Sequence, residues 1–150
     1  MIYEFCAENV TLLEKAMEAG ARRIELCDNL AVGGTTPSYG VTKAAVELAA
    51  NYDTTIMTMI RPRGGDFVYN DLEIAIMLED IRLTAQAGSQ GVVFGALTAD
   101  KKLDKPNLEK LIAASKGMEI VFHMAFDELS DEDQLEAIDW LSQVGVTRIL

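Results

Sequence analysis

The sequence predicts an α/β protein built from repeated strand–helix units with parallel strands. Short apolar segments typical of strands alternate with segments whose apolar residues follow helical spacing. One junction recurs at residues 19–24, 87–92 and 144–149, where a glycine ends a helix and an apolar strand follows. The units repeat about every 30 residues, as in a TIM (β/α)8-type barrel. Because only about six βα units fit the chain, an open doubly wound parallel sheet is the alternative.

The strands follow from apolar and β-branched runs that end at glycine, proline or polar residues. Arg61-Pro62 ends the third strand, since proline cannot donate a hydrogen bond to a neighbouring strand. The expected strands cover residues 2–6, 23–27, 54–60, 91–95, 119–122 and 147–150.

The helices between them follow from start signals. Thr11 with Glu14, and Asn70 with Glu73, have the spacing of a capping box. Ser130 precedes acidic residues that suit a helix N-terminus. The two remaining helices are expected at residues 41–50 and 106–116.

Composition bounds the class of protein. The chain has 150 residues, 49% of them hydrophobic and 25% charged, which is ordinary for one soluble globular domain. Its formal charge of -11 argues against nucleic acid and anionic membranes as partners. No secretory signal or membrane-spanning run is present, so the two cysteines are expected to be free thiols in the cytoplasm. Because six strands cannot close an eight-stranded barrel, we expect residues 1–150 to be a single barrel domain that is incomplete at its C-terminal end.

Chemically capable side chains gather where the expected strands end. Residues two apart on a strand share a face, so Glu4 faces the same way as Cys6, and Glu25 the same way as Cys27. In a barrel these residues would meet at the C-terminal mouth, where such proteins carry their chemistry. The expected mouth comprises Glu4, Cys6, Glu25, Cys27, Arg61 and His123, with Arg63, Asp66 and Asp127 from the loops above.

Two chemistries fit this set of residues. Cys6 and Cys27 on neighbouring strands would present two soft thiolates to Cu(I). Alternatively, the protein is a metal-independent enzyme in which Arg61 and Arg63 hold a small anionic substrate, with Glu4 and Asp66 beside them. In that enzyme the proton-transfer residues would be Glu25, His123 and Asp127. We expect Glu4 and Glu25 to pair with the two arginines, because inward carboxylates are rarely buried unpaired. The seven methionines are assigned to the core.

The motifs at these positions resemble those of the CutC copper-homeostasis family. The matching segments run through the whole chain in one order: Glu4–Cys6, Arg23–Cys27, Gly33–Ser38 with Gly40, Ile60–Tyr69 (IRPRGGDFVY), Gly91–Leu97 and Phe122–Asp127. The resemblance implies a cytoplasmic TIM barrel that self-associates and is linked to copper tolerance. It also implies that Cu(I) is bound by the cysteines that match Cys6 and Cys27.

The sequence departs from the family pattern in two places. Met124 stands where the family usually has an arginine, which removes a cation from the expected mouth. The family also continues for two βα units beyond the sixth strand. A third hypothesis is an assembly or interaction protein with a vestigial site, and it predicts a mass in solution that depends on concentration.

Overall fold

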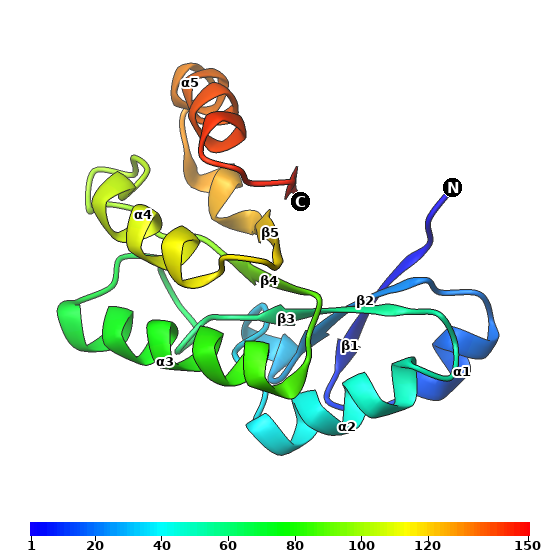
Figure 1. Cartoon of the computed structure of the whole chain (residues 1–150). Helices are drawn as coiled ribbons and strands as arrows, with labels where there is room; N and C mark the ends of the chain where they lie inside the picture. The colour runs from blue at the N-terminus through cyan, green and yellow to red at the C-terminus, as the bar shows by residue number, and fades with distance from the viewer.

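The structure is a computed structural model that describes residues 1–150, and it contains one sheet of six parallel strands (Figure 1). The strands follow chain order: β1 (Glu4–Glu8), β2 (Arg23–Cys27), β3 (Thr55–Met59), β4 (Gly91–Phe94), β5 (Glu119–Phe122) and β6 (Arg148–Ile149). The helices between them are α1 (Leu13–Glu18), α2 (Tyr39–Ala49), α3 (Asp71–Ala87), α4 (Lys105–Ala114) and α5 (Asp131–Gln143). Two 3-10 turns, η1 (Leu30–Val32) and η2 (Met124–Glu128), follow β2 and β5. None of the helices combines the length and the apolar character that crossing a bilayer requires.

The sheet curls as a partial TIM barrel. Its strand order 1-2-3-4-5-6 differs from that of a doubly wound sheet, in which the first strand lies inside the sheet. The two edge strands also approach each other, as the distance of 2.8 Å between the Arg148 guanidinium of β6 and the Glu4 carboxylate of β1 shows. A flat sheet would keep the first and sixth strands about 24 Å apart. The predicted barrel architecture is therefore confirmed, and the open-sheet alternative is wrong.

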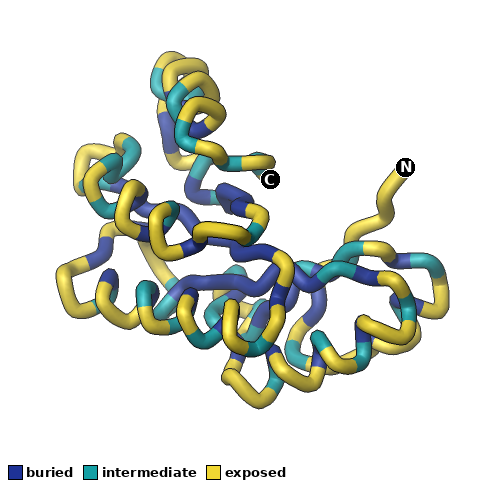
Figure 2. Tube along the Cα trace, viewed as in Figure 1, coloured by how far each residue is buried: buried dark blue, intermediate teal, exposed yellow.

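Each strand turns one face toward the helices and the other toward the barrel interior. Ile24 and Ile56 face outward and pack with α1 and α2. The outer face of β4 and β5 packs with α3, α4 and α5 in the largest core cluster. The interior cluster contains only residues from strands and their flanking loop: Cys27, Met57, Met59, Val93 and Val121, with Leu30 beside them. Figure 2 shows the strands as the buried layer and the helices with exposed outer faces.

The helix starts separate a correct prediction from a wrong one. The Asn70–Glu73 capping box is present, with both reciprocal hydrogen bonds formed. Ser130 caps α5 as expected, by accepting from the Asp133 amide. The Thr11–Glu14 box is wrong, because α1 starts after Leu12, which has a positive φ of 57° and no side-chain cap. The tight turn out of β1 fixes the entry into this short helix, so the spacing of Thr11 and Glu14 has no effect.

The formed Asn70–Glu73 cap and the absent Thr11–Glu14 cap predict different effects of substitution on stability. Asn70→Ala should lower the free energy of unfolding by about 1 kcal/mol, because it removes a formed cap. Thr11→Ala should change it by less than about 0.5 kcal/mol, because no cap exists there. Chemical denaturation of both variants beside wild type measures the two values. Equal losses in the two variants would contradict this account of α1.

Candidate metal centre

Two thiols and one carboxylate meet on the interior face of β1 and β2. The ligand atoms of Cys6, Glu25 and Cys27 all lie within 4.8 Å of one another. Both thiols donate to the same oxygen, Oε1 of Glu25, with Sγ–Oε1 distances of 3.4 Å for Cys6 and 3.6 Å for Cys27. Cys6 is exposed and Cys27 is buried, so the cluster reaches from solvent into the interior. This set of donors fits a soft metal ion with a proton acceptor beside it.

The strand register explains why the carboxylate lies between the thiols. In the β1–β2 ladder, Cys6 stands beside Glu25, while Cys27 stands beside Glu8 two residues further on. Ala7 and Leu26 face the helices, so the residues that flank them face the interior. The shared face of Cys6, Glu25 and Cys27 is thus as the sequence predicted.

Burial and hydrogen bonding raise the pKa of two members of this cluster, Cys27 and Glu25. The hydrogen bond with Cys6, followed by burial and the nearby Glu25 charge, raises the pKa of the Cys27 thiol far above its ordinary value. Burial also raises the pKa of Glu25, although the hydrogen bond from Cys6 opposes this rise. A metal ion that binds the thiolates must therefore displace protons.

Glu4 lies outside this cluster, at the opposite end of the barrel from the strand C-termini. It is the first residue of β1 and pairs with Arg148 at 2.8 Å and with Arg23 at 3.7 Å. Glu119 contacts the same two arginines, so four charges of alternating sign link β1, β2, β5 and β6 at their first residues. The expected pairing of Glu4 and Glu25 with Arg61 and Arg63 is wrong, because each of the four side chains bonds with other groups.

Arg61 is buried and ties two loops to the end of β3. Its guanidinium donates to the carbonyls of Val32 and Gly34 after β2, at 2.7 and 3.0 Å, and to that of Gly65 at 2.7 Å. Only 2% of the residue is exposed, and its charge lies 4.8 Å from the centre of the Phe67 ring. Arg61 therefore holds the loops together and does not face an open site.

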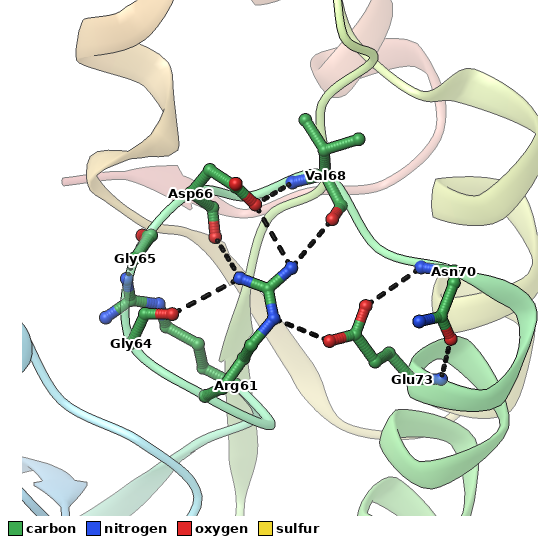
Figure 3. Close-up of polar contacts among 8 residues, drawn as sticks. Arg61, Gly64, Gly65, Asp66, Val68, Asn70 and Glu73 are labelled. Carbon is green, nitrogen blue, oxygen red and sulfur yellow. Dashed lines mark hydrogen bonds and ion pairs between the residues drawn. The ribbon is translucent and has the colours of Figure 1, made fainter.

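Arg63 uses all five of its N–H donors on its own loop and on α3. Nε donates to Glu73, which also forms the capping box of α3 with Asn70 (Figure 3). The other donors go to the carbonyls of Gly64, Asp66 and Val68 and to the carboxylate of Asp66. An anionic ligand would have to displace one of these bonds.

His123 is fully buried beneath Gly95 at the end of β5. Its Nδ1 accepts from the Ala125 amide, and its Nε2 has no partner. A Cβ at Gly95 would come within 2.7 Å of the imidazole, so the glycine is needed for the ring to fit. Asp127 lies exposed on η2, away from the thiols. The structure thus does not bring His123, Arg61 and Glu25 to one open point.

A separate pocket of about 580 Å³ opens at the C-terminal mouth. It lies between the loops after β3 and β4 and the end of η2. Asp66 is the only predicted site residue in its lining, which comprises Gly65, Asp66, Phe67, Val68, Leu97, Thr98, Ala99, Lys101 and Glu128. Met124, where the expected cation is missing, instead packs its methyl group over Gly33 beside the Arg61 guanidinium.

Fold and site together define a protein of the partial (β/α)-barrel class with a thiol–carboxylate cluster in its interior. The model of the CutC family matches residues 1–150, and the chain belongs to this family. A CutC family protein of Enterococcus faecalis is 55% identical over all 150 residues, which span 72% of that protein. A CutC family protein of Bacteroides fragilis is 43% identical over 99% of the chain and 58% of the relative.

Solved structures agree with the fold. A candidate copper homeostasis protein CutC from Streptococcus agalactiae superimposes with a TM-score of 0.96 at 50% identity, over 99% of this chain and 71% of that one. A candidate phosphonomutase from Burkholderia cenocepacia superimposes with a TM-score of 0.72 at 18% identity, over 99% and 61% of the two chains. The second likeness shows the barrel fold alone.

The ionic role of Arg23 and Arg148 was not among the expectations from sequence. A signal for it was present, because both arginines occur three residues after the glycine of the recurring junction. Each of these arginines is the first residue of its strand, and its side chain faces the barrel interior, where a cation requires a carboxylate partner. The alternating partners Glu4 and Glu119 are the first residues of their own strands. Comparing the strand starts with one another would have predicted the group.

The loop-tying role of Arg61 can be tested by substitution. Arg61→Gln should lower the free energy of unfolding by roughly 2–4 kcal/mol, because each buried carbonyl left without a donor costs on the order of 1–3 kcal/mol. Arg82→Gln is the control, since Arg82 forms an exposed pair with Glu79 and should change stability by less than about 0.5 kcal/mol. Urea denaturation measures both values. A loss below about 1 kcal/mol for Arg61→Gln would contradict the assignment.

Burial of His123 predicts a pH dependence of stability. Burial, assisted by the Arg61 charge, lowers the pKa of His123 to about 3. The unfolded chain binds this proton below about pH 6.5 and the folded chain does not, so folding stability falls as pH drops, by up to about 1.4 kcal/mol per unit. The stability difference between wild type and His123→Gln should shrink by about 2 kcal/mol from pH 7.5 to pH 5. An unchanged difference would show that His123 does titrate in the folded state.

Proposed function

We propose that this protein is a copper-homeostasis protein that binds Cu(I) through Cys6 and Cys27. The observation that supports the proposal is the convergence of both thiols on Glu25, with all three ligand atoms within 4.8 Å of one another. The name of the S. agalactiae relative, which concerns copper homeostasis, points to the same metal. Soft thiolates prefer Cu(I) over hard divalent ions.

Each residue of the cluster has a distinct part in the proposed binding. Cys6 is exposed and would meet the incoming ion first, and Cys27 would complete the pair from the buried side. Glu25 already accepts from both thiols, so it is placed to take a proton as the thiolates form. The ion is cargo in this proposal, and the protein supplies two sulfur ligands and a proton acceptor. We place this activity in the reducing cytoplasm, where both thiols stay free.

The metal-independent enzyme has less support. It requires donors at an open site, yet every donor of Arg63 is satisfied within its own loop and α3, and Arg61 and His123 are buried. The pocket at the mouth offers Lys101 as a cation, but Lys101 pairs with Glu128 at 2.8 Å. Self-association, which the family resemblance implies, stays a prediction.

The proposal is tested by anaerobic titration of the reduced protein with Cu(I) against a competing chelator. Wild type should bind one equivalent, and Cys6→Ser/Cys27→Ser should lose more than the roughly 10–100-fold in affinity that loss of an outer-shell partner costs. Glu25→Gln keeps both sulfurs and should lose less. Circular dichroism of each variant checks the fold. Equal affinity in wild type and the double variant would overturn the proposal.

A further inference from the structure

The interior face of the barrel carries more sulfur than its two cysteines. Met57 and Met59 of β3 point inward with exposures of 0% and 1%, and both belong to the interior cluster that contains Cys27. In the β2–β3 ladder, Met57 stands beside Glu25, and continuing the register places Met59 beside Cys27. A row of soft atoms therefore continues from the thiols onto the neighbouring strand.

The two methionines lean in opposite directions. A Cβ at Gly34 would lie 3.1 Å from the Cys27 Sγ and 3.6 Å from the Met59 Cε, so thiol and thioether ends meet over one glycine. A Cβ at Gly91, by contrast, would lie 2.1 Å from Cε and 2.6 Å from Sδ of Met57. The thioether of Met57 thus lies on β4, away from the thiols.

The space shared by Cys27 and Met59 is kept open by the backbone. Gly34 has a φ of +87°, a conformation that suits glycine, and its carbonyl accepts from Arg61. Any side chain here would press on the Cys27 sulfur. Methionine is unbranched, so rotation about its terminal bonds can turn Sδ toward Cys27 without a backbone shift.

We propose that the Met59 thioether is a third ligand of the Cu(I) bound by Cys6 and Cys27. This inference rests on the proposed function and deepens it. Thioether and thiolate sulfur both suit Cu(I), whereas the carboxylate of Glu25 is a hard donor better suited to holding a proton. The site is then made of three sulfurs from three neighbouring strands, with Glu25 as the proton acceptor beside them.

Selenium labelling tests the ligand directly. The protein, with selenomethionine at its seven methionine positions, is loaded with Cu(I), and X-ray absorption at the selenium edge reports whether copper is a direct neighbour. We expect a copper–selenium path whose amplitude corresponds to one selenium in seven. The path should vanish in Met59→Leu and persist in Met57→Leu. Leucine conserves volume, so both variants should fold.

Affinity provides the second measurement. By chelator competition, Met59→Leu should bind Cu(I) about tenfold or more weakly than wild type, and Met57→Leu should equal wild type. If wild type binds Cu(I) through its cysteines but shows no copper–selenium path, and both leucine variants bind equally, Met59 is not a ligand and the proposed function stands. If wild type itself does not bind Cu(I), both proposals fail.

Discussion

The two-residue alternation of the strands is the constraint on which the rest of the molecule depends. Every strand has a face against helices and a face toward the barrel interior. Ile56 and Met57 are neighbours in sequence, yet Ile56 packs with α1 and α2 while Met57 lies in the interior cluster. A shift of register by one residue would send the thiols into the helix layer and the isoleucines into the interior. The site therefore exists only because of this alternation.

Along the barrel axis the interior divides into three levels. The strand starts carry the alternating charges of Glu4, Arg23, Glu119 and Arg148, which join the edge strands. The middle level carries sulfur and small apolar groups, and the strand ends carry Arg61 and His123 beneath the loops. The charges at the strand starts pair with one another, and the Arg61 charge at the strand ends is bonded to backbone carbonyls. The thiol–carboxylate cluster differs, because its two thiols carry protons that a metal ion can replace.

Sequence periodicity predicted the six strands and the shared face of Cys6, Glu25 and Cys27, since alternation is a local property. The barrel class followed from the length of the repeated unit, the side chains at the strand ends and the family resemblance, with an open sheet as the alternative. It did not predict side-chain partners, because those depend on the curl of the sheet and on loop conformation. Glu4 and Arg148 are 144 residues apart in the chain and meet only when the sheet curls. Arg61 donates to carbonyls of two loops, and the direction of a backbone carbonyl cannot be read from the residue types around it. A pattern of apolar residues likewise could not predict that the Met59 side chain points toward Cys27.

Charge balance gives a physical reason for a carboxylate beside one exposed and one buried thiol. A thiolate at the buried Cys27, beside the carboxylate of Glu25, would be costly without a compensating cation, which agrees with the raised pKa of Cys27. With Glu25 ionised and both thiols protonated, the cluster carries one negative charge. If Cu(I) enters, one thiol proton moves to Glu25 and the other leaves, so the cluster again carries one negative charge. The exchange of one cation for one proton avoids building up charge in the interior, and it requires the acceptor to lie within reach of both sulfurs, as Glu25 does.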